Sequence, residues 1–184
     1  MSGDVRRSYV VGLGANLGDR LATLRSAVLS LQEQGRLAAV SALYECAPVG
    51  PPQPHYLNAA VLLDSALAPG VLMTQLLAIE RAHGRERRER WGPRTLDLDL
   101  LFTPALVLNE AHLTLPHPEL ARRAFALSPL LDVASDATDP RSGVRYADLL
   151  LALGEQGVRR VATREVWDPR PDGAALQAER NTPR

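Results

Sequence analysis

The sequence predicts an α+β fold, a βαββαβ sandwich with a mainly antiparallel sheet and helices packed on one of its faces. Leucines alternate with threonine and aspartate over residues 95–100, which is the two-residue period of a strand. Apolar residues recur at helical spacing after Asp19 and again after Pro69. These patterns follow one another as strand, helix, strand, strand, helix, strand, and that order favours a two-layer sandwich.

The chain begins with a strand and a helix. Residues 9–13 read as a short buried strand, and a turn-rich link leads to a helix that Asp19 caps and Gly35 closes. Gly12 and Gly14 resemble the start of a dinucleotide fingerprint. The third glycine is misplaced for that motif, so a tight connection between strand and helix is the better interpretation.

The next strands, residues 37–45 and 56–64, are separated by a proline-rich loop. This loop, residues 46–55, cannot form a regular element and is expected to be a wall of a binding site. A second helix begins at residues 68–70 and ends near Glu80. On the strand 56–64, alternate residues share a face.

The later elements are expected to be shorter. A hairpin-like excursion through Pro104 and Asn109 leads to residues 113–115, and a loop follows at 116–118. Helical turns are expected at residues 119–133, with an interruption at Pro129. A turn-rich linker at 136–143 then leads to a short helix at 146–153. Beyond Arg164 the chain is polar and is expected to contribute little core. We therefore expect one domain over residues 1–163 and a polar C-terminal extension over 164–184.

Composition excludes several classes of protein. The 184 residues are 46% hydrophobic, as in a globular domain, and no apolar run approaches the roughly 18 residues that span a membrane. The start of the chain is polar, which predicts a cytoplasmic protein. The formal charge of zero argues against a nucleic-acid partner. A single cysteine excludes an internal disulfide, and the absence of lysine excludes Schiff-base chemistry. A monomer is favoured over an oligomer.

Two acids, Asp97 and Asp99, share one face of the predicted strand. Residues two apart on a strand lie roughly 6.6 Å apart, so both carboxylates reach the same small volume. Such a pair repels unless a cation lies between the two or one is protonated. Mg²⁺ shared with a polyphosphate meets that need, since Mg²⁺ favours one or two carboxylates plus phosphate oxygens. An edge strand with two solvated acids is the alternative.

An arginine-rich segment comes directly before the two acids. Residues 84–94 hold five arginines, and the segment reads as a loop because Gly84 stands at its start and Gly92 and Pro93 stand near its end. Arginine forks bind phosphate oxygens in a bidentate manner while acids hold the metal, and together they suggest phosphoryl-type transfer. Mixed charges on a solvated loop are the alternative.

The sequence of residues 84–101 resembles the signature of the 6-hydroxymethyl-7,8-dihydropterin pyrophosphokinase family. Its pattern is G-R-x-R-x-x-R-W-G-P-R-T-L-D-L-D-L-L. Three further blocks resemble the family in the same order, and the resemblance covers about residues 9–153: G-L-G-A-N-L-G-D at 12–19, Y-L-N-A-A-V at 56–61, and L-P-H-P at 115–118 followed by R-A-F at 123–125.

The resemblance implies a ferredoxin-like arrangement and a specific reaction. The pyrophosphoryl group of ATP passes to the hydroxymethyl group of 6-hydroxymethyl-7,8-dihydropterin, which gives AMP and the pterin diphosphate in tetrahydrofolate biosynthesis. Asp97 and Asp99 would hold two Mg²⁺ ions, and Arg85 and Arg94 would act with them as catalytic residues. The partners would be these two small molecules.

The resemblance also assigns the two substrate sites. The implied pterin-binding residues are Cys46, Ala47, Pro48, Val49, Tyr56, Asn58, Trp91 and Phe125. The implied ATP-binding residues are Glu80, Arg87, Arg94, Leu100, Thr114, His117 and Arg123. An aromatic pair can clamp a flat heterocycle, and an amide donates and accepts side by side. Each of these residues also has a structural interpretation, in the core or at the surface.

Some assignments depart from the family or compete with alternatives. Many members carry threonine where Cys46 stands, so a buried small hydrophobe is the alternative for Cys46. For Glu80, an ion pair with an arginine of the following loop is the alternative. Another ATP–Mg²⁺ transferase on the same sandwich is a rival function. A ferredoxin-like RNA binder would need exposed aromatics on its central strands, where this chain has leucine and aspartate.

Overall fold

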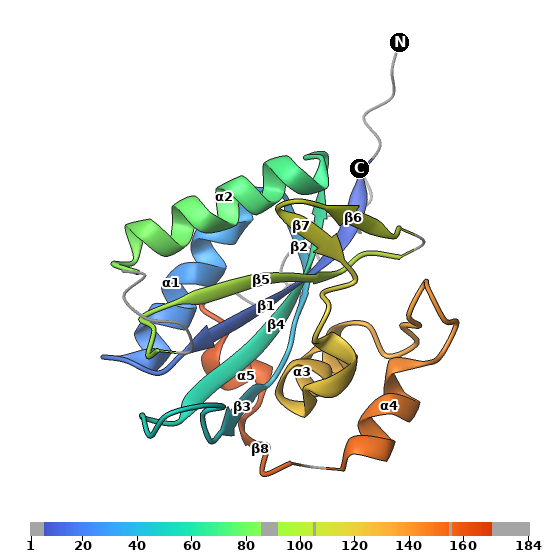
Figure 1. Ribbon diagram of the computed structural model, residues 1–184. Helices are drawn as coiled ribbons and strands as arrows, with labels where there is room; N and C mark the ends of the chain where they lie inside the picture. The colour runs from blue at the N-terminus through green and yellow to red at the C-terminus, as the bar shows by residue number, and fades with distance from the viewer. Residues whose placement is uncertain (1–5, 86–91, 105, 155, 171–184) are drawn as a thin grey trace, which may run out of the picture.

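The computed structural model describes residues 6–85, 92–104, 106–154 and 156–170 (Figure 1). A twisted sheet lies at its centre in the order β5-β1-β4-β3-β8, with β2 also paired to β4, and every pairing is antiparallel. Its strands are β1 (Arg7–Ala15), β2 (Arg36–Val40), β3 (Leu43–Cys46), β4 (Tyr56–Ser65), β5 (Asp97–Phe102) and β8 (Arg159–Ala162). A small separate hairpin joins β6 (Leu108–Glu110) and β7 (Leu113–Leu115). The mixed α and β composition and the antiparallel sheet are confirmed.

Helices cover both faces of the sheet, and not the single face that the sequence predicted. Figure 1 shows α1 (Arg20–Gln32) and α2 (Pro69–Ala82) on one side, with α3 (Ala124–Val133) and α4 (Tyr146–Leu153) on the other. Two apolar clusters match these layers. Val11 and its alternate neighbours pack under α1 and α2, whereas Val10, Ala60 and Phe102 pack under α3. The central strands are apolar on both faces, so each face needs a cover.

The predicted starts of the first two helices are confirmed, but Gly35 does not close α1, which ends at Gln32 with Glu33 as its C-cap. Asp19 accepts a hydrogen bond from the backbone N–H of Ala22 at 3.0 Å and caps α1. Pro69 occupies the first position of α2, where its missing N–H costs nothing. The helix at residues 146–153 has the predicted bounds. Pro129 does not interrupt α3, which runs through it from Ala124 to Val133.

The strand predicted at residues 37–45 is two strands. β2 and β3 both pair with β4, but Ser41 and Ala42 lie between them. Ser41 exchanges hydrogen bonds with Ala60: its backbone N–H donates to the Ala60 carbonyl at 2.9 Å, and its Oγ accepts from the Ala60 N–H at 2.9 Å. A side chain thus replaces one backbone group of the ladder, and the strand breaks there.

The start of the predicted C-terminal extension joins the core. α5 (Arg164–Trp167) places Trp167 inside the cluster under α1, where its Nε1 donates to the carbonyl of Ser41 at 2.8 Å. Arg25 donates to the carbonyls of Val166 and Trp167, each at 3.0 Å. The expectation of little core beyond Arg164 was wrong for residues 164–170, because one large apolar residue anchors an otherwise polar segment. Residues 171–184 lie outside the described residues.

Two smaller findings complete the fold. β8 was not predicted, because its short sequence, Arg-Arg-Val-Ala, forms a mostly exposed edge strand without a buried face. Within the described parts of the chain, none of the helices has the length and apolarity needed to cross a membrane.

Candidate active site

The two aspartates of β5 lie on the sheet face that α3 covers. The strand buries Leu98 and Leu100 in the core under α1 and α2, whereas Asp97 and Asp99 are directed to the opposite face. The alternation predicted from the sequence is therefore confirmed. β1 lies alongside, with Asp97 opposite Gly14. The acids thus stand beside strand positions that carry no side chain.

Gly12 and Gly14 keep this region of the sheet open. A Cβ at Gly14 would lie 3.4 Å from Oδ1 of Asn58, and one at Gly12 would lie 3.0 Å from Cδ1 of Leu101. Side chains at these positions would therefore fill the space above the strands. These glycines form the floor of a pocket, a role that the interpretation as a strand-to-helix connection had missed.

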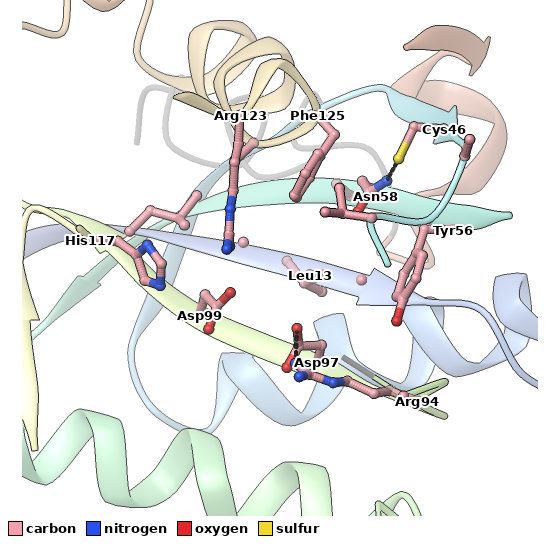
Figure 2. A pocket seen from close by; sticks show the side chains of 18 residues that line it. Leu13, Cys46, Tyr56, Asn58, Arg94, Asp97, Asp99, His117, Arg123 and Phe125 are labelled. Carbon is pink, nitrogen blue, oxygen red and sulfur yellow. Dashed lines mark hydrogen bonds and ion pairs between the residues drawn. The ribbon is translucent and has the colours of Figure 1, made fainter. Parts of the chain in front are cut away.

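The pocket has a volume of about 310 Å³ and lies between the sheet, the loop after β3 and the start of α3 (Figure 2). Its lining combines apolar, amide and charged side chains. The lining residues are Gly12, Leu13, Gly14, Cys46, Ala47, Val49, Tyr56, Asn58, Ala59, Gly92, Arg94, Asp97, Asp99, Leu101, His117, Arg123, Phe125 and Ala126. Most of the residues that the sequence assigned to two substrates therefore meet in one pocket.

One end of the pocket is aromatic and contains an amide. Tyr56 and Asn58 share a face of β4, and Figure 2 shows Phe125 reaching towards the sheet from α3. The Nδ2 of Asn58 donates to Sγ of Cys46 at 3.2 Å. Burial raises the pKa of the Cys46 thiol, so the sulfur stays neutral and serves as an acceptor. A flat ring with polar edges fits this end.

The other end of the pocket is charged. The carboxylate of Asp97 forms ion pairs with Nη1 of Arg94 at 2.6 Å and with Nη1 of Arg85 at 2.8 Å. Asp99 lies deeper, and burial, followed by repulsion from Asp97, raises its pKa to about 7. The two carboxylates therefore differ: Arg94 and Arg85 pair with Asp97, whereas burial favours the neutral form of Asp99, although Arg123 and Arg94 oppose that shift.

The acid pair suits a metal ion that also binds substrate oxygens. In the part of the chain that the structure describes, no group of three or more His, Cys, Asp or Glu side chains could hold a metal by itself. Two carboxylates completed by phosphate oxygens are the arrangement that Mg²⁺ uses. Burial disfavours the charged form of Asp99, so a bound cation would stabilise its carboxylate. The donor set fits Mg²⁺ bound together with a polyphosphate.

Glu80 supports the site from below and does not line the pocket. Glu80 is 1% exposed, and its carboxylate accepts a hydrogen bond from the backbone N–H of Leu98 at 2.7 Å and is paired with Arg85. Burial raises the pKa of Glu80, although the Leu98 N–H and Arg85 oppose that shift. Of the two roles considered for Glu80, the structure supports pairing with a loop arginine.

His117 is held in one orientation at the edge of the pocket. Its backbone N–H donates to the carbonyl of Leu101 at 2.8 Å, and its Nδ1 accepts from the backbone N–H of Glu119 at 3.2 Å. The proton of the neutral ring therefore lies on Nε2. Burial and the nearby Arg123 lower the pKa of His117, so the ring is neutral at pH 7.

Several predicted residues lie elsewhere. The side chain of Leu100 packs in the core on the opposite face, because its parity on β5 differs from that of the acids. Pro48 and Thr114 are not among the residues that line the pocket. Arg87 and Trp91 lie outside the described residues.

Sequence reasoning missed Asn16, which joins two loops of the site. Asn16 is 2% exposed, and its Nδ2 donates to Oε1 of Gln53 at 2.9 Å and to the Pro54 carbonyl at 3.1 Å. Its Oδ1 accepts from the backbone N–H of Arg94 at 2.7 Å. The signal was available, since Asn16 is the one amide in the block at residues 12–19.

The fold and this pocket define a class of protein: a small α+β protein whose pocket joins an aromatic end with an amide to a charged end with two aspartates. The sequence model of the 7,8-dihydro-6-hydroxymethylpterin-pyrophosphokinase (HPPK) family matches residues 10–135. The chain belongs to this family.

Individual relatives agree with that assignment. The chain is 42% identical over 175 residues to the 2-amino-4-hydroxy-6-hydroxymethyldihydropteridine pyrophosphokinase of Synechocystis sp., covering 92% of this chain and 86% of the relative. The enzyme of the same name from Pseudomonas aeruginosa is 41% identical over 160 residues, covering 85% of this chain and 98% of that one.

A solved structure shares the fold. It is Plasmodium falciparum HPPK-DHPS A437G with pteroate, which aligns with a TM-score of 0.67 at 12% identity. The alignment covers 87% of this chain and 47% of the longer one, so the present chain spans about half of that protein. At this identity the likeness concerns the fold alone.

Proposed function

We propose that the protein transfers the pyrophosphoryl group of ATP to the hydroxymethyl group of 6-hydroxymethyl-7,8-dihydropterin, with release of AMP. The observation that carries this proposal is the continuity of the pocket. Its aromatic and amide end runs over the same strand face into the pair Asp97 and Asp99. Family membership supplies the identity of the two substrates.

The aromatic end would bind the pterin. Phe125 and Tyr56 supply apolar surface for the flat ring, and Asn58 supplies a fixed amide for its polar edge. Since Nδ2 of Asn58 is bonded to Cys46, the amide oxygen is the group left to accept from a ring N–H. Cys46, Ala47 and Val49 would close the wall, with Pro48 contributing through the loop backbone.

The charged end would bind the triphosphate. Arg94 and Arg123 line it, and the Nε2–H of His117 is a neutral donor suited to a phosphate oxygen. Arg85 and Arg94 would offset charge that builds on the transferred group, because fixed cations act most strongly where water is excluded. Leu100 and Thr114 have no side-chain contact with the pocket, so any contact with ATP would be through the backbone.

Asp97 and Asp99 would hold Mg²⁺, with two ions as the number that the family resemblance implies. When bound, the metal supplies Lewis-acid polarisation of the phosphate and acceptor oxygens. Asp99 contributes a buried carboxylate that a bound cation would stabilise. Arg94 and Arg85 contribute the fixed cations that keep Asp97 in place.

The finer description of the fold is part of the same proposal. β2 and β3 together can be counted as the second strand of a ferredoxin-like unit, since both pair with β4 on the same side. In that numbering β1 is strand 1, β2 with β3 is strand 2, β4 is strand 3 and β5 is strand 4. The spatial order of the four strands is then 4-1-3-2. The organisation as one domain, a cytoplasmic location and a monomeric state stay predictions from the sequence.

The test is release of AMP from ATP and Mg²⁺, measured with and without 6-hydroxymethyl-7,8-dihydropterin. We expect AMP only when the pterin is present. A dihydropterin with a 6-methyl group is the matched control, because it keeps the ring but has no acceptor hydroxyl. Release of ADP, or equal AMP release with the 6-methyl compound, would refute the proposal. Pterin fluorescence titration separates it from another ATP–Mg²⁺ transferase, which would not bind the pterin.

A further inference from the structure

Asp132 joins α3 to the start of β3. It lies in the last turn of α3, and its Oδ2 accepts two hydrogen bonds, from the hydroxyl of Tyr44 at 2.9 Å and from the backbone N–H of Ala42 at 3.0 Å. Both donors belong to the segment that leads to Cys46 in the pocket wall. One carboxylate oxygen thus connects the helix above the pocket with the strand beside it.

Tyr44 stands directly beside the pocket. It pairs with Asn58 across β3 and β4, and residues directly opposite on neighbouring strands carry their side chains on the same face. The side chain of Tyr44 therefore rises next to Asn58 towards α3. Phe125 is seven residues before Asp132, about two helical turns, so both lie on the same side of α3.

Directional contacts of this kind constrain the width of the pocket. Apolar packing also holds α3 on the sheet, through residues such as Leu127 and Leu130, but such packing has no preferred direction. Burial and the hydrogen bond to Asp132 raise the pKa of Tyr44 to about 12, so the hydroxyl keeps its proton at neutral pH.

We propose that Tyr44 and Asp132 are positioning residues for the heterocycle, because their bond sets the separation between Phe125 on α3 and Asn58 on β4. Neither side chain lines the pocket. The pterin as the heterocycle rests on the proposed function, whereas the bridge itself does not.

The first test compares Tyr44→Phe with wild type. This change removes only the hydroxyl, and we expect the Kd for 6-hydroxymethyl-7,8-dihydropterin to rise about five- to tenfold. The KM for ATP should stay within about twofold, since the charged end is held by Arg94 and Asp97. A general loss of structure would raise both constants together, so the difference between them identifies positioning.

Changes at Asp132 test the partner. Asp132→Asn keeps an acceptor oxygen and should weaken pterin binding only about twofold, whereas Asp132→Ala should match or exceed the effect of Tyr44→Phe. The double variant Tyr44→Phe with Asp132→Ala should bind the pterin no more weakly than Asp132→Ala alone, because both changes break one bridge. Additive losses would contradict the bridge.

Tyr9→Phe is the matched control. Tyr9 lies on β1 in the core under α1 and α2, and its hydroxyl donates to the carbonyl of Leu67 at 2.7 Å. The same tyrosine hydroxyl is removed, here from a hydrogen bond to a backbone carbonyl on the far face of the sheet. We expect a similar loss of stability and an unchanged Kd for the pterin.

Cys46 gives a readout that needs no substrate. It is the single cysteine of the chain and is 6% exposed, so alkylation by iodoacetamide reports on opening of the pocket wall. We expect several-fold faster alkylation in Tyr44→Phe and Asp132→Ala and an unchanged rate in Tyr9→Phe.

The outcomes separate the two proposals. If wild type does not bind the pterin, the proposed function fails, and the alkylation rates alone then decide whether the bridge holds the wall. If wild type binds and Tyr44→Phe binds equally well, the positioning role is wrong whatever the alkylation rates.

Discussion

The carboxylate of Glu80 accepts a hydrogen bond from the backbone N–H of Leu98 at 2.7 Å, and Leu98 is the residue between the two aspartates of β5. The same carboxylate is paired with Arg85, whose guanidinium also contacts Asp97 at 2.8 Å. A buried acid at the end of α2 therefore fixes the backbone of the site and one of its arginines. The backbone of β5 and the position of Arg85 therefore both depend on one side chain.

Replacing Glu80 should be costly. Glu80→Ala leaves a backbone N–H and a guanidinium without this buried partner, and we expect a loss of about 3 kcal/mol in the free energy of unfolding. Urea denaturation measures it. Glu45→Ala is the control. Glu45 forms ion pairs with Arg20 at 3.1 Å and Arg159 at 3.0 Å, but its side chain is 21% exposed. There we expect a loss below about 1 kcal/mol, and equal losses would contradict the argument.

Replacing Asp99 should lower activity without lowering stability. Asp99→Asn should reduce AMP formation by roughly a hundredfold or more, because the proposed metal ligand is lost. The raised pKa of Asp99 means that stability is lost as pH rises from about 4 to about 7. Without magnesium at pH 8, Asp99→Asn should therefore be at least as stable as wild type in urea. A variant that is inactive and also less stable would point to a structural role.

The sequence predicted the site better than the layers around it. The alternation over residues 95–100 placed Asp97 and Asp99 correctly because period-two patterning is local. The sequence did not predict helices on both faces of the sheet. The second face is covered by α3, which packs on small or apolar residues such as Ala60, and no local pattern singles out such residues. The anchoring of Trp167 on Ser41 joins residues 126 positions apart, and no sequence motif marks such a contact.

Gly35 should be intolerant of any side chain. A Cβ at this position would lie 2.4 Å from the carbonyl oxygen of Asp64, and a backbone atom cannot move away as a side chain can. We expect Gly35→Ala to lower the free energy of unfolding by about 2–3 kcal/mol. Gly70→Ala is the control, since nothing lies within 4 Å of its Cβ and it lies in α2. That change should be neutral or stabilise by about 0.5 kcal/mol, and thermal unfolding of both variants gives the comparison.

Trp167 should contribute to the stability of the domain despite its place near the end of the described chain. Trp167→Ala empties a buried site and should cost about 4 kcal/mol, whereas Trp167→Phe keeps a ring and should cost about 1–2 kcal/mol. Chemical denaturation distinguishes the two. Val166 is 66% exposed, so Val166→Ala should change stability by less than about 0.5 kcal/mol. Equal stability of wild type and Trp167→Ala would show that α5 does not anchor the sheet.

His117 should make the protein sensitive to acid. Its pKa in the fold lies below the ordinary value of 6.5, because the ring is buried beside Arg123. The unfolded chain therefore takes up the proton first, and stability is lost as pH falls below about 6.5. Glutamine cannot titrate, so His117→Gln should remove the loss of stability at low pH that protonation of His117 causes. Urea denaturation of both proteins at pH 8, 6.5 and 5 measures the difference. The two curves should converge towards low pH as the advantage of the neutral imidazole disappears, and parallel curves would show that His117 does not couple folding to protonation.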